Sequence, residues 1–229
     1  MFTGIVQGVA KVESVQALTG LHRLRLGLPA DLQQAVSLGA SMAVDGVCLT
    51  VCAWSDTGIV DFDVMQQTLE VTTLGALRPG HLVNVERAAR ADTEIGGHPL
   101  SGHIDFKAHL LQVLRPPNNR VWRLNIPSPW MRYVFEKGYV AVNGASLTVA
   151  RCERRTDGSG VIEVWLIPET LRQTTFDVFG EGNELNIEVD RTTQAVVDTV
   201  ERVLAQWAKE QGSPVPALGG LKPGAAQSV

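Results

Sequence analysis

The fold is decided by Val44-Asp45-Gly46-Val47-Cys48-Leu49-Thr50-Val51, because this stretch returns 98 positions later as Val142-Asn143-Gly144-Ala145-Ser146-Leu147-Thr148-Val149. Thr3-Gly4-Ile5-Val6 returns at the same spacing as Ser101-Gly102-His103-Ile104. Two later blocks, residues 67–73 and 83–86, return after 102 positions as residues 169–175 and 185–188. Four blocks in the same order predict a duplicated domain. The change of spacing gives the second copy four extra residues, which we expect in the turn at residues 156–160.

Each copy has the sequence pattern of an all-β domain. Stretches such as residues 58–64 and 161–166 alternate apolar with polar side chains, and turn residues interrupt the chain about every ten positions. Asp45-Gly46 and Asn143-Gly144 are dipeptides that favour the positive φ of a tight hairpin turn or a bulge. A β-unit of this size hides its strand edges best by closing into a small barrel. We therefore predict two barrels, with short helical turns near residues 67–74 and 130–137.

The pattern becomes helical at Thr192, where Thr192 or Thr193 can act as the N-cap. An apolar stripe follows at steps of four, three and four, formed by Val196, Val200, Val203 and Trp207. Such a stripe needs a partner, which is either the chain's own barrel or the same helix in further copies. Beyond Gln211, glycine and proline are too frequent for regular structure, so we expect a disordered tail. The predicted domains are residues 1–97, 98–191, 192–210 and 211–229.

The composition of the chain limits the classes of function. Of 229 residues, 45% are hydrophobic and 19% are charged, which supplies a packed core and excludes wholesale disorder. A net charge of −4 without a basic block argues against binding to a nucleic-acid backbone. No apolar run approaches the roughly 18 residues of a membrane span, and the N-terminus lacks the pattern of a signal peptide. Three cysteines outside any C-x-x-C motif indicate a reduced, cytoplasmic protein.

The two copies differ at the positions that carry the most chemistry. Cys48 and Ser146 are equivalent, so one copy offers a thiol where the other offers a hydroxyl. A thiolate is the stronger nucleophile, although a single cysteine is more often a small buried hydrophobe. His103 stands where the first copy has Ile5, and it adds a candidate proton carrier. His98 could carry protons too, but it follows two glycines, and a histidine in a glycine turn is more often solvated.

Small polar residues are frequent in the repeated blocks. Gly4, Thr50, Gly102 and Thr148 can offer backbone groups and hydroxyls to the edge of a flat heterocycle, or can simply let strands approach closely. Cys48 and Cys52 lack a histidine at ligand spacing, so no metal site is predicted. The chain contains no P-loop, no G-x-G-x-x-G and no G-x-S-x-G. No motif therefore supports ATP binding, NAD binding or serine-hydrolase chemistry.

Several blocks together resemble the α-chain type of riboflavin synthase. They are Met1-Phe2-Thr3-Gly4-Ile5-Val6, Gly46-Val47-Cys48-Leu49-Thr50-Val51, Gly96-Gly97-His98-Pro99-Leu100-Ser101-Gly102-His103-Ile104, Lys137-Gly138, Ser146-Leu147-Thr148-Val149 and Leu166-Ile167-Pro168-Glu169-Thr170-Leu171. The resemblance runs from Met1 to about Ala205, and the number of ordered blocks makes it specific. It implies two six-stranded Greek-key barrels that bind lumazine, followed by a C-terminal helix that gathers a homotrimer. It also implies an active site between the first barrel of one subunit and the second barrel of its neighbour.

The resemblance implies a reaction as well. Two molecules of 6,7-dimethyl-8-ribityllumazine dismutate by transfer of a four-carbon unit, which yields riboflavin and 5-amino-6-ribitylamino-uracil. The reaction needs no cofactor and no metal. Each site would hold two lumazine molecules, and riboflavin would leave as a product. Association with lumazine synthase is left open, whereas neither a nucleic acid nor a membrane is an expected partner.

The resemblance assigns pocket residues to both copies. In the first copy they are Gly4, Ile5, Val6, Cys48, Leu49, Thr50, Asp63, Val64, Met65, Gln66, Gln67 and Thr68. In the second copy they are Gly102, His103, Ile104, Lys137, Ser146, Leu147, Thr148, Leu166, Ile167, Pro168, Glu169, Thr170 and Leu171. Cys48 would act beside one lumazine, while Ser146, Thr148 and His103 would move protons at the other. Phe2 and Asp190 are also implicated, and Asp190 has the alternative role of capping the helix that follows.

Gln67 departs from the family pattern, and one alternative function stays open. Gln67 stands where the family usually has a glutamate, as Glu169 is in the second copy, so the first pocket lacks that negative charge. The alternative function is a lumazine- or flavin-binding protein of the same superfamily without turnover. Such a protein would be expected to lose one of its two pockets and Cys48, whereas this chain keeps the residues of both pockets and Cys48.

Overall fold

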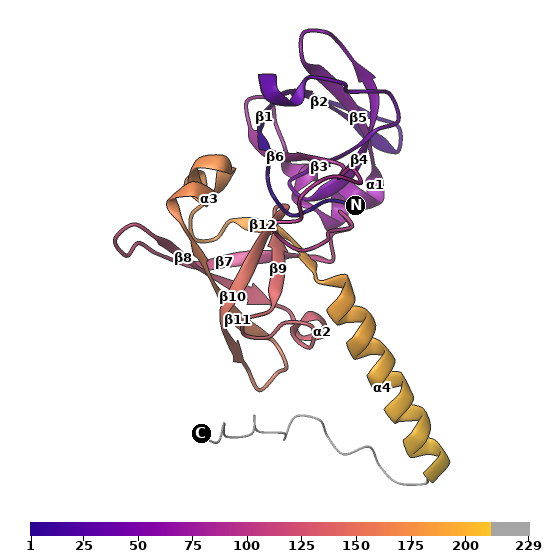
Figure 1. Ribbon diagram of the computed structural model, residues 1–229, viewed down its shortest axis with the longest axis vertical. Helices are drawn as coiled ribbons and strands as arrows, with labels where there is room; N and C mark the ends of the chain where they lie inside the picture. The colour runs from indigo at the N-terminus through magenta and orange to yellow at the C-terminus, as the bar shows by residue number, and fades with distance from the viewer. Residues whose placement is uncertain (212–229) are drawn as a thin grey trace. The chain divides into compact units, whose positions relative to one another are not determined.

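The computed structural model describes residues 1–211 of the chain. In this part, strands form two closed barrels (Figure 1). The first barrel contains β1 (Gly8–Leu18), β2 (Leu21–Gly27), β3 (Ser41–Val44), β4 (Val47–Trp54), β5 (Ile59–Met65) and β6 (Leu82–Arg87). The second barrel contains β7 (Phe106–Leu114), β8 (Arg120–Ile126), β9 (Tyr139–Val142), β10 (Ala145–Arg154), β11 (Gly160–Leu166) and β12 (Glu184–Val189).

Both barrels have the same strand order. Neighbouring strands around the first barrel are β1-β2-β5-β4-β3-β6, and around the second barrel β7-β8-β11-β10-β9-β12, with every pair antiparallel. Strands β3, β4 and β5 follow one another as hairpins, while β2 lies beside β5, which is a Greek key. Closure leaves neither barrel with a free strand edge. The structure confirms the predicted all-β fold of two tandem six-stranded Greek-key barrels followed by an α-helix.

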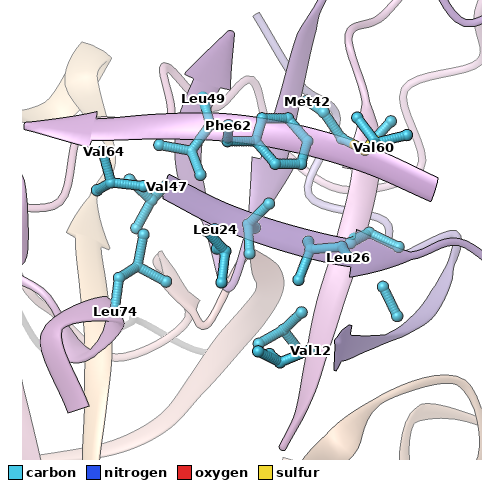
Figure 2. Packing of buried hydrophobic residues seen from close by; sticks show 14 of the residues in the cluster. Val12, Leu24, Leu26, Met42, Val47, Leu49, Val60, Phe62, Val64 and Leu74 are labelled. Carbon is cyan, nitrogen blue, oxygen red and sulfur yellow. The ribbon is translucent and has the colours of Figure 1, made fainter. Parts of the chain in front are cut away.

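The alternation of side chains along the strands builds the barrel cores. The inward side chains of β5 are no more than 1% exposed and are those of Val60, Phe62 and Val64. Figure 2 shows them packed in one cluster with apolar side chains of β2 and β4. Asp63 and Met65, which alternate with them, are exposed. Because successive side chains of a strand point to opposite faces, the alternation in the sequence determines which residues enter the core.

Short helices lie between the strands where helical turns were predicted. Residues 67–74 fall in α1 (Gln66–Val71) and the 3-10 helix η2 (Thr73–Ala76). Their counterparts in the second copy are α3 (Pro168–Gln173) and η3 (Thr175–Val178). The helical turn predicted at residues 130–137 overlaps α2 (Ser128–Met131) only at its first two residues, and residues 132–137 form turns and irregular structure. A further short helix, η1 (Ala30–Leu32), precedes β3.

The four extra residues of the second copy lengthen a hairpin, and the prediction that they lie in its turn is wrong. Both turns close in the same way, since Ser55 N donates to Ile59 O and Arg155 N donates to Ser159 O. Between the bulge and the turn, β4 and β5 form two residue pairs, whereas β10 and β11 form four. The side chains of a strand alternate with a period of two, so the addition of two residues to each arm leaves all the remaining side chains on their original faces.

The helix α4 (Arg191–Gln211) follows β12 in the chain. It begins one residue before Thr192, so Thr192 and Thr193 lie in its first turn and not at the N-cap, a shift within the usual uncertainty of helix ends. The side chains of the predicted stripe are 46–58% exposed and are those of Val196, Val200, Val203 and Trp207. Except for its first residue, the predicted tail at residues 211–229 lies outside the described part of the chain. Within residues 1–211, no helix is long and apolar enough to cross a membrane.

Candidate functional site

The segments that precede β1 and β7 cross between the two barrels. Gly4 O, before β1, accepts a hydrogen bond from Ser146 N of β10 at 2.8 Å. Gly102 O, before β7, accepts the equivalent bond from Cys48 N of β4, also at 2.8 Å. Ile104 in the same segment packs against the core of the first barrel. Each copy therefore contributes a segment to the region around the candidate reactive residue of the other copy.

This arrangement corrects the grouping that the family resemblance implied. That grouping placed Gly4 with Cys48 and Gly102 with Ser146, whereas the hydrogen bonds pair them the other way round. We call the first group, Cys48 and Thr50 with residues 102–104, the Cys48 site. We call the second group, Ser146 and Thr148 with residues 4–6, the Ser146 site.

Only glycine fits the two crossing points. Gly4 has a φ of +76°, and a Cβ atom there would lie 2.6 Å from Ser146 Cβ. Gly102 has a φ of +79°, and a Cβ atom there would lie 2.6 Å from Cys48 Cβ. Positive φ and the close approach both exclude a side chain. The repeated glycines are therefore required by the crossing, in agreement with the interpretation of these small residues as points where backbone segments approach closely.

His98 belongs to the Ser146 site, although the sequence favoured a solvated position for it. Its Nδ1 lies 2.6 Å from Ser146 Oγ, and its ring stacks on Tyr139 with 5.2 Å between centroids. The side chain is only 4% exposed, and Nε2 has no hydrogen-bond partner among the described residues. The sequence feature that could have indicated this contact is Gly96-Gly97, because a Cβ on Gly97 would lie 3.0 Å from Ser146 Oγ. Glycines there let the loop bring His98 against the strand.

Burial and a nearby charge act on His98 in opposite directions. Burial lowers the pKa of the His98 imidazole below its ordinary value, and the charge of Asp190 raises that pKa to a smaller extent. Burial therefore favours the neutral imidazole, while the carboxylate of Asp190 favours the imidazolium. Ser146, His98 and Asp190 thus form one electrostatic unit at this site.

Cys48 lies at the contact between the barrels. Its thiol is free and its side chain is half-buried. It packs on an apolar cluster that includes Phe2 and Leu100. Phe2 is 1% exposed and forms two backbone hydrogen bonds with Leu100, at 2.8 and 2.9 Å. Phe2 therefore fixes the crossing segments beside Cys48, which gives a structural reason for its presence in the N-terminal block.

Several predicted pocket residues face the barrel interior and can offer only backbone atoms to a ligand. Their side chains are buried in the cores, and they are Leu49, Val64, Leu147 and Leu166. Thr50 and Thr148 alternate with them, and their side chains are exposed next to Cys48 and Ser146 along β4 and β10. The strand period of two explains this division, because residues one apart lie on opposite faces.

The remaining predicted residues lie at the strand ends that lead into α1 and α3. Side chains that are exposed belong to Asp63, Met65, Gln66, Gln67, Ile167, Pro168 and Glu169, while Thr68, Thr170 and Leu171 are half-buried. Two of the acids have local partners. Asp63 accepts two hydrogen bonds from Arg23, at 2.8 and 2.9 Å, and this guanidinium lowers the pKa of Asp63. Glu169 accepts from Arg172 and from Gln173, and these bonds lower the pKa of Glu169.

Two further predicted residues have exposed side chains close to the sites. His103 lies in the segment of the Cys48 site, and its carbonyl accepts a hydrogen bond from Arg191 at 2.5 Å. Lys137 has a φ of +66° in the turn before β9, and its N–H donates to Val149 O at 2.8 Å. The structure therefore places His103 beside Cys48, whereas the resemblance grouped it with Ser146.

A cavity of about 1030 Å³ lies away from both sites, and of the predicted residues only Gln66 lines it. Asp45 and its counterpart Asn143 both contribute to its wall. Burial raises the pKa of Asp45 to about 7. No group of three or more potential metal ligands occurs within residues 1–211.

Comparisons with known proteins agree with this duplicated architecture. Residues 3–88 and 101–190 each match the family model of the lumazine binding domain. The riboflavin synthase of Escherichia coli (strain K12) is 43% identical over 215 residues, which cover 93% of this chain and 98% of that protein. The riboflavin synthase of Chlamydia pneumoniae is 39% identical over 212 residues, which cover 92% of this chain and 100% of that protein.

Solved structures show the same architecture. LumP in complex with 6,7-dimethyl-8-(1'-D-ribityl) lumazine aligns with a TM-score of 0.73 and 25% identity, over 83% of this chain and 100% of LumP. LumP in complex with riboflavin aligns with a TM-score of 0.72 and 26% identity over the same shares. With two lumazine binding domains and this degree of identity to curated enzymes, the chain belongs to the riboflavin synthase family.

Proposed function

We propose that this chain is a riboflavin synthase. It converts two molecules of 6,7-dimethyl-8-ribityllumazine into riboflavin and 5-amino-6-ribitylamino-uracil by transfer of a four-carbon unit. The observation that carries the proposal is a duplicated barrel with Cys48 in one copy and Ser146 at the equivalent position of the other. Two molecules of one compound need similar binding sites and opposite chemical roles, and two unequal copies of one domain meet that need.

The Ser146 site supports proton transfer. One lumazine must lose a proton from its C7 methyl group before it can attack the other molecule. The neutral imidazole of His98, 2.6 Å from Ser146 Oγ, can take that proton through the hydroxyl. The charge of Asp190 then favours the imidazolium that forms. We therefore place the lumazine that loses its proton at this site, with the exposed hydroxyl of Thr148 as a further polar contact.

The Cys48 site supports nucleophilic addition. The second lumazine needs a nucleophile at C7, and the free Cys48 thiol is the strongest candidate nucleophile at either site. Thr50 follows on the same face of β4, and the exposed imidazole of His103 comes from the crossing segment. Both can exchange protons with a ligand bound there. The lumazine that is attacked is accordingly placed at this site.

The two lumazine molecules meet in a homotrimer. In the proposed assembly, the Cys48 site of one subunit faces the Ser146 site of the next, and the α4 helices associate through their exposed apolar stripe. Support comes from the spacing and exposure of Val196, Val200, Val203 and Trp207. Holding two rings face to face can lower the barrier by about 7–11 kcal/mol, because a bimolecular step becomes intramolecular.

A turnover assay tests the proposal. The purified protein is incubated with 6,7-dimethyl-8-ribityllumazine alone, and lumazine and riboflavin are followed by absorbance. We expect one riboflavin for every two lumazine molecules consumed. The control is the double variant Cys48→Ser, Ser146→Ala, which removes both candidate reactive groups, and circular dichroism establishes that it is folded.

The second candidate function is binding of lumazine or riboflavin without turnover, which the similarity to the LumP complexes favours. In that case the fluorescence of bound lumazine would change on mixing, and no riboflavin would form. Gln67, which lacks the charge of Glu169, would then be the first residue to exchange.

A further inference from the structure

A buried glutamate holds each crossing segment. Glu86 of β6 and Glu188 of β12 occupy equivalent positions and are 2% and 1% exposed. Glu188 accepts from Ser101 N and Ser101 Oγ, both at 2.7 Å, and from Gly102 N at 2.9 Å. Glu86 accepts from Thr3 N at 2.6 Å, Thr3 Oγ1 at 2.8 Å and Gly4 N at 3.2 Å. Three hydrogen bonds to one carboxylate fix the segment more firmly than packing of a glycine could.

Each anchored segment also forms a hydrogen bond with a strand of the opposite barrel, and so helps to position that strand. The amide of Gly102 is held by Glu188, and the carbonyl of Gly102 accepts from Cys48 N at 2.8 Å. Ser101 Oγ also accepts from His103 N at 3.2 Å, so His103 depends on the same anchor. In the other half, Glu86 holds Gly4, and the carbonyl of Gly4 accepts from Ser146 N at 2.8 Å. One glycine therefore separates each carboxylate from a candidate reactive residue.

The two anchors differ in their electrostatics. Arg191 Nε lies 3.7 Å from Glu188, and Arg191 Nη1 bonds Asp105 at 2.8 Å. The position equivalent to Arg191 in the first copy is Ala89. Burial raises the pKa of Glu86, against the opposing effect of its bonds to Thr3 and Gly4. Glu188 thus has a guanidinium beside it, whereas Glu86 has the N-terminal ammonium, whose charge also lowers the pKa of Glu86.

We propose that Glu86 and Glu188 are positioning residues that act crosswise, with Glu188 setting the geometry of the Cys48 site and Glu86 that of the Ser146 site. The assignment of these groups as ligand sites rests on the proposed function. A carboxylate that merely stabilised its own barrel would affect both sites alike. Crosswise action instead predicts that each variant disturbs one site and spares the other.

The test uses Glu188→Gln and Glu86→Gln in the full chain. Glutamine keeps the size of the side chain but turns an NH₂ group toward a backbone N–H, so the segment loses one of its acceptors. Asp61→Asn is the matched control, because Asp61 is also buried but pairs with Arg25 on the outside of the first barrel. Circular dichroism establishes that each variant is folded. If a glutamine variant does not fold, Glu→Asp at the same position is used instead. Aspartate keeps the carboxylate but has a side chain one methylene shorter, so the carboxylate lies farther from the amides of the segment.

Two readouts without substrate report on the two sites. The first is the rate at which iodoacetamide alkylates Cys48, resolved from Cys52 and Cys152 by peptide mass spectrometry. The second is the NMR spectrum of the His98 imidazole, which lies against Ser146. We expect Glu188→Gln to raise the alkylation rate of Cys48 about tenfold and leave His98 unchanged, because a released segment uncovers the thiol. We expect Glu86→Gln to shift the His98 signals and leave the alkylation rate unchanged.

Turnover gives the third readout. Each variant should lower kcat about 10- to 100-fold, because small displacements of reacting groups cost rates of that order. Equal changes of both probes in both variants, or no change in either, would overturn the proposal. The two probes need no substrate, so a crosswise pattern in a protein that forms no riboflavin would reject only the proposed function. Riboflavin formation by the wild type without the crosswise pattern would reject only the positioning role.

Discussion

A single atom, sulfur at Cys48 against oxygen at Ser146, makes the two halves of the chain chemically unequal. Both residues sit at the start of equivalent strands and donate the same backbone hydrogen bond to a crossing glycine. Their side chains are both half-buried, so the two sites do not differ in the exposure of these residues. Their surroundings do differ, because His98 Nδ1 lies 2.6 Å from Ser146 Oγ, whereas Cys48 packs on an apolar cluster. A thiol loses its proton to give a nucleophilic thiolate far more readily than a hydroxyl does, and the hydroxyl therefore needs a base.

Replacing Cys48 by serine should separate turnover from binding. We expect kcat to fall at least about tenfold with little change in lumazine affinity, because the side chain keeps its size and loses its nucleophilic sulfur. Steady-state kinetics and a fluorescence titration with lumazine measure the two quantities. Cys52→Ser, at an exposed thiol, is the control and should leave both unchanged. Full turnover in Cys48→Ser would remove this residue from the mechanism.

Replacing His98 by asparagine should remove the acid side of the pH–rate profile. Because burial lowers the pKa of His98 below its ordinary value of 6.5, the wild type should keep its neutral base, and its rate, to a lower pH than an exposed histidine allows. The His98→Asn variant should be slower at every pH, and its profile should lack the acid limb, which is the fall in rate at low pH where His98 is protonated. The kcat/KM profile from pH 5 to 9 measures it, and His109→Asn, at a mostly exposed histidine, serves as the control. Loss of the limb in the control as well would contradict the assignment.

Asp45 should make the stability of the fold depend on pH. Its Oδ1 accepts from Asn84 N at 2.8 Å, as Asn143 Oδ1 accepts from Asn186 N at 2.7 Å. Burial raises the pKa of Asp45 from 3.8 to about 7, so the folded chain keeps a proton that the unfolded chain releases. Below pH 3.8 both states are protonated, and above pH 7 both are ionised. The free energy of unfolding therefore falls as the pH rises through this window.

Asp45→Asn should flatten that profile, because asparagine cannot ionise. The gain in the free energy of unfolding over the wild type should be larger at pH 8 than at pH 4. It should grow by about 1.4 kcal/mol for every pH unit that separates the pKa of Asp45 in the folded chain from its pKa in the unfolded chain. Urea denaturation at a series of pH values measures it. The reciprocal variant Asn143→Asp should steepen the loss at high pH, and an identical profile for wild type and Asp45→Asn would show that the carboxyl is ionised throughout.

At the scale of elements, a strand keeps its buried and exposed faces when residues are added two at a time, and a helix can gather its apolar residues on one face. The longer β10–β11 hairpin keeps the alternation of its counterpart β4–β5 because it gains residues equally in both arms. The helix α4 gathers its exposed apolar residues at steps of four, three and four. A stripe with that spacing is typical of helices that associate side by side.

Val200→Asp should prevent assembly of the proposed trimer. Val200 is 46% exposed in the middle of the stripe, and a carboxylate there would be buried without a partner if helices associated. Sedimentation velocity should show a shift from three copies to one, with loss of turnover because each site needs two subunits. Glu201→Asp, one residue away and off the stripe, is the control. A trimer that survives Val200→Asp would mean that the helices do not form the seam.

At the scale of the whole molecule, the two copies meet at their matching turns. A Cβ on Gly46 would lie 2.7 Å from Gly144 N, and a Cβ on Gly144 would lie 2.9 Å from Gly46 N. Around this contact, Asn84 Nδ2 donates to Asn143 O and Asn186 Nδ2 donates to Asp45 O, at 3.0 and 2.9 Å. The paired bonds relate the barrels by an approximate two-fold operation and join them into one unit.

Gly46→Ala should loosen this contact. We expect a loss of about 2–4 kcal/mol in the free energy of unfolding, from the clash with Gly144 together with the positive φ of +81°. Gly20→Ala is the matched control, because Gly20 has a φ of +78° and nothing within 4 Å of the added atom. It should lose only about 1 kcal/mol, the cost of the backbone conformation alone. Equal losses in the two variants, measured by urea denaturation, would argue against close packing of the turns.

The sequence by itself determined the architecture. Exact spacing between repeated blocks revealed the duplication, and alternation with a period of two assigned the core faces, because both properties are local or copied along the chain. It also identified Cys48 and Ser146 as equivalent residues that differ in chemistry. The helix and its stripe could be placed to within one residue for the same reason.

Only the tertiary structure decided which residues share a site. The crossing of the segments at Gly4 and Gly102 exchanges them between barrels, and no local pattern encodes that exchange. The sequence predicted a solvated His98 from its glycine-rich context, whereas the close approach of the Gly97 backbone to Ser146 brings His98 against that residue. In the sequence, Glu86 and Glu188 look like ordinary strand residues. Their burial is explained only by the backbone amides that converge on each carboxylate, and the sequence does not show which amides those are. Those contacts join residues more than 80 positions apart, and such distances are set by closure of the barrels and by their packing against each other.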